Sequence, residues 1–217
     1  MKSDIQKALP SLVFALFFLA SCATFHHHTD EDHEHHHSHH DHDNAGRLLV
    51  HTNDGSVFVL DSSDGDVLAE YRGQLDAGAA MVNVSSSGEF GFVTHRENWL
   101  TLVVDSGFEL EEHGDHYDLH IEDPRMLGTV LTGAKPSHFY SALGKTLFYN
   151  DDEGTMSLFE DRNLRRSLEF QSIKARVDHG APLITGDSIV VGYLNHKEID
   201  ILGFDGRIKQ TLPTGNR

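Results

Sequence analysis

A repeat of about 44 residues is the feature that most limits how this chain can fold. Four similar runs, each closed by an aspartate, end at Asp61, Asp105, Asp161 and Asp205 and read "SVFVLD", "LTLVVD", "MSLFED" and "DILGFD". The intervals between these aspartates are 44, 56 and 44 residues. A period in the forties, with several short strands in each unit, is typical of β-propeller blades.

Each repeat divides into four strands, a to d, separated by Gly and Asp turn residues. In the third repeat the expected strands are "SHFYSA", "KTLFYN", "TMSLFE" and "SLEFQS". Gly144 and Gly154 occupy its first two turns, where glycine accepts a positive φ at little cost. The second repeat carries the insertion "ELEEHGDHYDLHIEDPR" before its last strand. The sequence therefore predicts an all-β chain, with about four four-stranded blades over residues 46–217.

The first repeat begins late, because "RLLVHT" reads as its strand b and no strand a precedes it. The chain ends at "TLPTGNR", after the last strand of the fourth repeat, so no strand remains to close a ring. We therefore expect an incomplete ring. The chain is either the N-terminal portion of a longer propeller or a shortened member with an open edge, which is an aggregation hazard.

Residues 1–22 have the features of a signal peptide. Lys2 and Lys7 give a basic start, and the apolar run 12–20 is too short to span a bilayer. The run ends in "LASC", which resembles the bacterial lipobox and predicts lipidation of Cys22, the only cysteine. The alternative is an ordinary signal peptide cut after a small residue. Either processing predicts export.

Residues 23–45 are expected to be disordered, because the tract 26–43 has no apolar side chain to bury. Ten of its eighteen residues are histidine and six are acidic. The histidines are His26, His27, His28, His33, His35, His36, His37, His39, His40 and His42. Neutral imidazoles bind Zn(II), Cu(II) and Ni(II), so the tract predicts a flexible collector of metal ions. The alternative is a pH-responsive or solvating linker, since histidine titrates near 6.5.

The charge balance excludes one class of partner. The chain has 34 acidic and 17 basic residues, for a formal net charge of −17. Such a chain repels nucleic acid and attracts cations or basic partners.

Eight further histidines lie outside the tract, and five of them are expected on one face of the propeller. His51, His95 and His196 end strand b of their repeats, whereas His138 and His179 lie at the start of strand a, beside the central channel. The axis of a propeller face is a usual ligand site, so His138 and His179 are candidate metal ligands. For His51 and His196 a solvated or packing role is the simpler interpretation.

The insertion adds a second group, with His113, His116 and His120 around Asp115 and Asp118. Spacings of three and four residues allow neighbouring imidazoles and carboxylates to reach one divalent cation. The alternative is a solvated acidic loop. An insertion between strands c and d leaves from the face opposite the b–c turns, unless it folds back over the channel.

The exported leader, the tract, the repeats and the strings "EEHGDHYDLHIEDPR", "GAKPSHF" and "DHGAPL" resemble the AztD-type periplasmic zinc metallochaperones. That resemblance implies a β-propeller that binds Zn(2+) and passes it to the solute-binding protein of a zinc ABC importer. It implies that His113, His116, His138 and His179 are zinc ligands, with His95 as a weaker candidate. Members of the family are about twice as long as this chain, and Cys22 would make this one a lipid-anchored periplasmic protein.

Two other functions compete with a zinc carrier. A metal with an open coordination position could make the propeller an enzyme. No Ser/His/Asp or Cys/His arrangement is apparent in the sequence, so we expect no enzymatic activity. The other is a non-enzymatic interaction scaffold or metal buffer, with the tract as a pH-responsive linker.

Overall fold

The computed structural model describes residues 17–19, 46–114 and 116–215, and these residues are almost entirely β-structure. The one helical element among them is the short 3-10 helix η1 (Asp161–Asn163). Of the residues that the structure describes, none forms a helix long and apolar enough to cross a membrane. The all-β prediction is confirmed.

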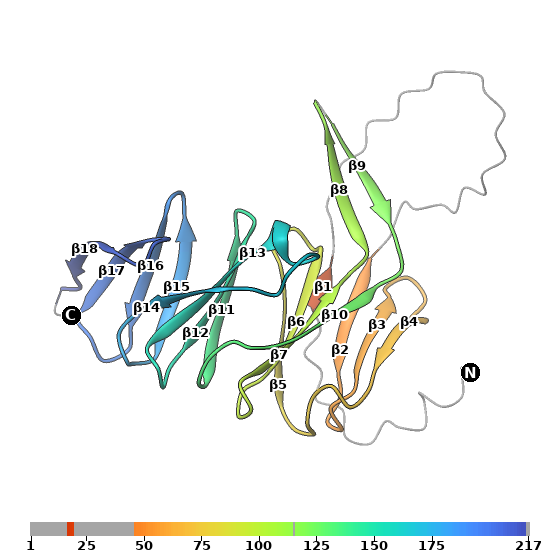
Figure 1. The fold of residues 1–217 in the computed structure, drawn as a ribbon, viewed down its shortest axis with the longest axis horizontal. Coiled ribbons are helices and arrows are strands. Elements are labelled where there is room, and N and C mark those ends of the chain that lie inside the picture. Colours follow the sequence, from red (N-terminus) through yellow and green to blue (C-terminus); the bar gives the residue numbers. More distant parts are fainter. Residues whose placement is uncertain (1–16, 20–45, 115, 216–217) are drawn as a thin grey trace.

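Four four-stranded antiparallel sheets follow one another along the chain as blades 1 to 4 (Figure 1). Blade 1 contains β1 (Phe17–Leu19), β2 (Arg47–His51), β3 (Val57–Asp61) and β4 (Val67–Tyr71). Blade 2 contains β5 (Ala80–Val84), β6 (Phe90–His95), β7 (Leu100–Asp105) and β10 (Arg125–Leu131). Blade 3 contains β11 (Pro136–Ala142), β12 (Lys145–Asn150), β13 (Thr155–Glu160) and β14 (Gln171–Lys174). Blade 4 contains β15 (Gly180–Thr185), β16 (Ser188–Tyr193), β17 (Glu198–Gly203) and β18 (Ile208–Pro213).

The insertion of blade 2 forms a two-stranded hairpin of its own, β8 (Phe108–His113) and β9 (His116–Ile121). It leaves blade 2 after β7 and returns to β10, so β10 still pairs with β7 as the fourth strand. Figure 1 shows the hairpin projecting beyond one edge of the blades.

Blade 1 corrects the expectation that its strand a is absent. Residues Phe17–Leu19 pair antiparallel with β2, with Phe17 opposite Leu49 and Leu19 opposite Arg47. Without a strand a, β2 would be an edge strand with unpaired backbone N–H and C=O groups. Residues Phe17–Leu19, which have high β propensity, pair with these groups. These residues belong to the expected signal peptide, so cleavage before Cys22 would leave that edge of β2 open.

The last strand of blade 3 begins later than the sequence predicted. Its expected range was 167–172, whereas β14 is Gln171–Lys174, paired with β13 from Leu158 opposite Gln171. Leu168 and Phe170 instead pack against the apolar cluster between blades 2 and 3. Side-chain burial there outweighs strand pairing, which is why the shift occurs.

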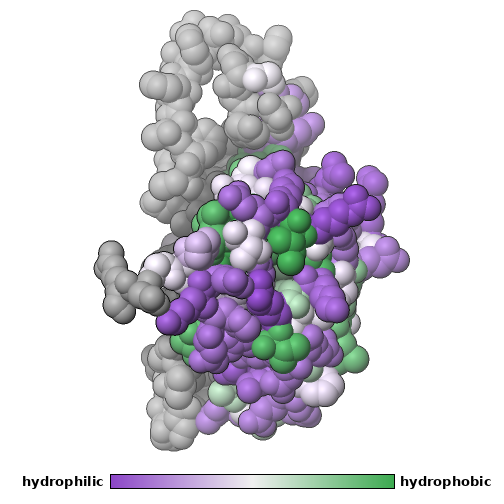
Figure 2. Space-filling view, turned by 90° about the vertical axis from the view of Figure 1, so that its left-hand side faces the viewer, coloured by the Kyte–Doolittle hydropathy of each residue, from purple (hydrophilic) through white to green (hydrophobic). Residues whose placement is uncertain are grey.

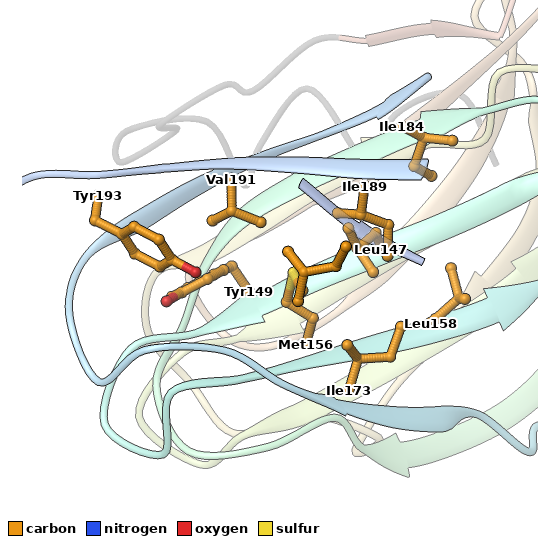
Figure 3. Close-up of a cluster of buried hydrophobic side chains, with 10 residues drawn as sticks. Leu147, Tyr149, Met156, Leu158, Ile173, Ile184, Ile189, Val191 and Tyr193 are labelled. Atoms are coloured by element: carbon orange, nitrogen blue, oxygen red, sulfur yellow. The ribbon is translucent and has the colours of Figure 1, made fainter. Parts of the chain in front are cut away.

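The core consists of apolar layers between successive blades. Successive residues of one strand serve different layers, because side chains alternate across a sheet. In β7, Leu102 packs toward blade 1 and Val103 toward blade 3. Between blades 3 and 4, Tyr149 and Tyr193 lie with ring centroids 6.4 Å apart at one end of a buried cluster (Figure 3). Each blade therefore depends on its neighbours for burial.

The blades form a row in which blades 1 and 4 lie at opposite ends (Figure 1). On the outward face of blade 4, Leu183 and Leu212 are exposed. Figure 2 shows this end of the molecule, where scattered hydrophobic side chains lie among hydrophilic ones. The described residues thus form four successive four-stranded blades, as the sequence predicted.

Candidate metal site

Two histidines from neighbouring blades meet at the starts of their innermost strands. His138 belongs to β11, after a register shift that follows Pro136, and His179 immediately precedes β15. Their Nε2 atoms are 2.8 Å apart and their ring centroids 4.5 Å apart. His138 is half-buried and His179 is exposed. The sequence predicted both positions beside the channel, and the structure brings them together.

The spacing of the two nitrogens suits a shared metal ion. A tetrahedral zinc ion with Zn–N distances of about 2.0–2.1 Å holds two ligating nitrogens about 3.3–3.4 Å apart. The observed 2.8 Å is a hydrogen-bond distance, so a small rotation of either ring would admit the ion. Exposure of His179 leaves a route by which an ion enters and leaves.

Asp151 fixes the orientation of His179. This carboxylate lies in the turn after β12, and its Oδ2 accepts a hydrogen bond from Nδ1 of His179 at 3.0 Å. Ser137 donates its hydroxyl to Oδ1, and Nη2 of Arg96 lies 3.4 Å from Oδ2. A proton held on Nδ1 leaves the lone pair on Nε2, the atom that faces His138. Sequence analysis missed Asp151, since the signal is a contact between two blades and not a spacing in the chain.

His138 is favoured in the neutral form that binds metals. Burial lowers its pKa, and the neighbouring His179 lowers it further. A neutral imidazole offers its lone pair to a cation at neutral pH without first losing a proton.

The histidine pair supplies only part of a coordination sphere. Zinc takes three or four nitrogen or oxygen ligands from a protein. Over the described ranges, no group of three or more His, Cys, Asp or Glu residues is arranged to hold a metal ion. Further ligands would have to come from water or from other parts of the protein.

The hairpin carries a second, separate group of polar side chains. His113 and His116 are opposite each other at the tip. Nε2 of His113 lies 3.5 Å from carboxylate oxygens of both Glu111 and Asp118. Nε2 of His120 lies 2.9 Å from Oε2 of Glu111. Asp115 and the side chain of His116 lie outside what the structure describes.

The hairpin and the histidine pair lie at opposite ends of blade 3. Arg165, which follows the C-terminal end of β13, bonds the base of the hairpin through the carbonyl oxygen of Phe108 at 2.7 Å and Glu109 at 3.0 Å. Asp151 lies in the turn before the N-terminal end of β13. A six-residue strand spans about 20 Å. The structure therefore places His113 at the end of blade 3 remote from His138 and His179, because the insertion leaves from the other face, as the sequence predicted, and Arg165 anchors it there. That His113 is a zinc ligand stays a prediction of the family resemblance.

The remaining blade histidines are held inside the fold or at its surface by local contacts. His95 is buried, and its Nδ1 accepts a hydrogen bond from the backbone N–H of Asn98 at 3.4 Å. His51 is also buried, and its pKa is lowered by burial and then by His95. Nε2 of His196 lies 3.7 Å from Asp178, and its ring packs edge-on against Tyr193. None of these three has a described contact with the His138–His179 pair.

The predicted tract ligands and the lipidation site lie outside the described residues. They are Cys22, His26, His27, His28, His33, His35, His36, His37, His39, His40 and His42.

The fold and the site define a class, a β-propeller protein with a histidine pair at the starts of two neighbouring inner strands. No family model matches the chain. The curated zinc chaperone AztD of Citrobacter koseri is 30% identical over 174 residues, which are 80% of this chain and 39% of that protein. The chain is therefore an AztD-type protein over the part that it shares with this relative, and it spans less than half of the relative's length.

Solved structures agree with the β-propeller fold, and the one at 25% identity agrees with the family as well. A crystal structure of Citrobacter koseri AztD matches with a TM-score of 0.62 and 25% identity over 71% of this chain and 43% of its own. The apo form of that protein gives a TM-score of 0.65 at 23% identity, covering 76% and 46%. The dihydro-heme d1 dehydrogenase NirN gives 0.51 at 15% identity, covering 77% of this chain and 34% of its own, a likeness of fold alone.

Proposed function

We propose that this chain is a zinc metallochaperone, a carrier without catalytic activity that binds zinc at the His138–His179 pair. The observation that carries the proposal is the 2.8 Å approach of the two Nε2 atoms, with Asp151 bonded behind His179. The name of the 30% identical relative, a zinc chaperone, supports zinc as the cargo. Because the chain spans only part of that relative, the activity of the whole protein remains part of the proposal.

A pair of this kind suits a carrier because an incoming protein can replace its ligands one at a time. His179 is exposed, with 43% of its side chain accessible. Two protein ligands also leave coordination positions open for those of a receiving protein. We propose that the receiver is the solute-binding protein of a zinc ABC importer.

We further propose that the histidine-rich tract 26–43 captures zinc ions before they reach the His138–His179 pair. Its ten histidines and six acidic residues would bind several zinc ions weakly and raise their concentration near the pair. We place the protein in the periplasm, held to a membrane through a lipid on Cys22.

The test is the route of zinc transfer. Zinc-loaded protein is mixed with a solute-binding protein of a zinc importer, and separately with a small chelator of equal affinity, while acceptor concentration is varied. A chaperone transfers zinc to the protein at a rate that rises with acceptor concentration and exceeds transfer to the chelator. One common rate for both acceptors, saturating at the dissociation rate, would reduce the protein to a zinc buffer.

A further inference from the structure

A pocket of about 430 Å³ contains two residues whose backbone conformation is unusual for residues with side chains. Of the described residues other than glycine, Trp99, Lys135 and Leu143 have a left-handed backbone, with φ of 60°, 56° and 56°. A side chain makes this conformation costly, most of all a bulky one. Trp99 and Lys135 both line this pocket. Strained backbone that gathers at one surface site points to a function there.

Trp99 takes a turn position that neighbouring blades give to glycine. It lies in the turn between β6 and β7, the second and third strands of blade 2. In the corresponding turns of blades 1 and 3 the left-handed residues are Gly55, with φ of 84°, and Gly154, with φ of 58°. Glycine adopts this conformation without strain, so the fold does not require a tryptophan here. Burial does not offset the strain, because 44% of the Trp99 surface is exposed.

The pocket adjoins the proposed zinc site. Two of its residues, Arg96 and Lys135, both contact Asp151. Nη2 of Arg96 lies 3.4 Å from Oδ2 of Asp151, and the carbonyl oxygen of Lys135 accepts a hydrogen bond from the backbone N–H of Asp151 at 3.1 Å. Asp151 in turn accepts the hydrogen bond from Nδ1 of His179 at 3.0 Å. One residue therefore separates the pocket from the histidine pair.

The pocket selects a ligand by its indole and not by its charge. Arg96 and Lys135 are balanced by Glu97 and Asp152, so the lining favours neither a cation nor an anion. Trp99 is the one apolar side chain among the lining residues. Tryptophan and arginine are enriched among the residues that dominate binding energy at protein–protein interfaces. The pocket therefore fits a protein that packs an apolar side chain on the indole and forms hydrogen bonds with the rim.

We propose that Trp99 is the central contact of a docking surface for the protein that receives zinc from the His138–His179 pair. This inference rests on the proposed function, because the position of the pocket beside the pair is what identifies the partner. The receiver presents an apolar side chain close to its own zinc ligands. Docking on Trp99 then holds those ligands beside His179, the exposed member of the pair, while the ion changes ligands.

Docking can be measured without zinc, because Trp99 is the only tryptophan of the chain. The full chain is labelled with 5-fluorotryptophan, and the zinc-free solute-binding protein of a zinc ABC importer from the same organism is added. The single fluorine resonance should shift and reach saturation as the complex forms. In calorimetric titrations, Trp99→Gly should bind this acceptor at least tenfold more weakly than the unaltered chain. Trp99→Phe keeps an aromatic face and should bind within fivefold.

Two controls separate loss of docking from loss of folding. Trp99→Gly gives the turn the residue type used in blades 1 and 3, so its urea unfolding midpoint should equal or exceed that of the unaltered chain. Leu143→Gly is the matched control, since Leu143 is also left-handed and is 65% exposed. It lies between β11 and β12, at the end of blade 3 remote from the pair, and its loss should leave acceptor binding within twofold.

The docking surface and the zinc function fail in different ways. The docking proposal is overturned if the acceptor leaves the fluorine resonance unmoved, if Trp99→Gly binds the acceptor as tightly as the unaltered chain, or if Leu143→Gly weakens binding equally. A chain that docks through Trp99, yet gives zinc to the acceptor no faster than to a chelator of equal affinity, would support the docking surface and contradict the chaperone.

Discussion

Nε2 of His138 lies 2.8 Å from Nε2 of His179, although 41 residues separate them and they start strands of different blades. The two histidines are brought together by the packing of blade 3 against blade 4. Leu147 and Tyr149 of blade 3 lie in one buried apolar cluster with Val191 and Tyr193 of blade 4. The metal site is therefore a property of the interface between two blades.

Removing one member of the pair should remove tight binding. We expect His138→Ala to weaken zinc affinity at least 100-fold, since one of two protein ligands at the site is lost. Competition titration against a chromogenic chelator measures it. The control is His196→Ala, whose imidazole lies against Asp178 and Tyr193 and should change affinity less than threefold. If His196→Ala weakened zinc affinity more than His138→Ala, the metal site would lie at the turns between strands b and c and not at the His138–His179 pair.

The carboxylate behind His179 should tune affinity without touching the ion. Asp151→Asn weakens the hold on the Nδ1 proton of His179, so we expect zinc affinity to fall 10- to 100-fold. Asp152→Asn is the matched control, because this neighbour pairs with Lys135 at 3.4 Å. Histidine NMR adds a readout that a merely structural effect would not move, since the Nδ1–H tautomer of His179 should be less populated in Asp151→Asn only.

The hairpin provides a test between the structure and the family resemblance. Because Arg165 holds the hairpin at the other end of blade 3, His113→Ala should leave the affinity of the His138–His179 pair within twofold. A loss as large as that of His138→Ala would show that the hairpin folds across to complete one four-histidine site. The same titration, run on both variants, decides between these outcomes.

Much of the fold was predictable because two features of each repeat indicate where its strands lie. Apolar alternation marks strands b and c, and an aspartate marks the end of strand c. The strands β3, β7 and β13 end within one residue of Asp61, Asp105 and Asp161. The start of β14 was not predictable, because Leu168 and Phe170 bury their side chains against another blade. Strand β1 was also missed, since its pairing with β2 joins segments separated by the whole tract.

The candidate site was predictable only in part. A propeller places the first residues of its inner strands together, so His138 and His179 could be paired from their positions alone. Asp151 depends on a turn of one blade reaching the next, and no pattern within a repeat records that contact. The burial of the Asp161 carboxyl was not predictable either. Its position in the repeat matches Asp61, Asp105 and Asp205, whose carboxylates each accept a hydrogen bond from the backbone N–H two residues ahead.

Capture and tight binding should separate when the tract is removed. Deleting residues 26–43 removes ten histidines, so we expect fewer zinc ions bound per chain and slower uptake at low zinc. The tight site should remain, because its two histidines lie in blades 3 and 4. Calorimetry gives stoichiometry and stopped-flow mixing gives the uptake rate. If the deletion abolished all binding, the tract alone would account for the metal.

The buried carboxyl of Asp161 should make stability depend on pH in a direction opposite to that of a paired carboxylate. Burial raises its pKa to about 6, above the usual value for the unfolded chain. The folded state therefore binds this proton more tightly, and its contribution to stability is full below about pH 4 and is lost as pH rises through about 6. That contribution is roughly 3 kcal/mol, for a difference of about two pKa units.

Urea unfolding at several pH values isolates this effect when each variant is compared with the unaltered chain. We expect the free energy of unfolding of Asp161→Asn, relative to the unaltered protein, to rise by about 2–3 kcal/mol between pH 4 and pH 7.5, because the variant has no carboxyl to ionise there. Asp205→Asn, changed at the exposed equivalent position, should show a much smaller trend. A flat difference for Asp161→Asn would mean that hydrogen bonds to the carboxyl of Asp161, such as one from the hydroxyl of Thr146, offset the effect of its burial on the pKa.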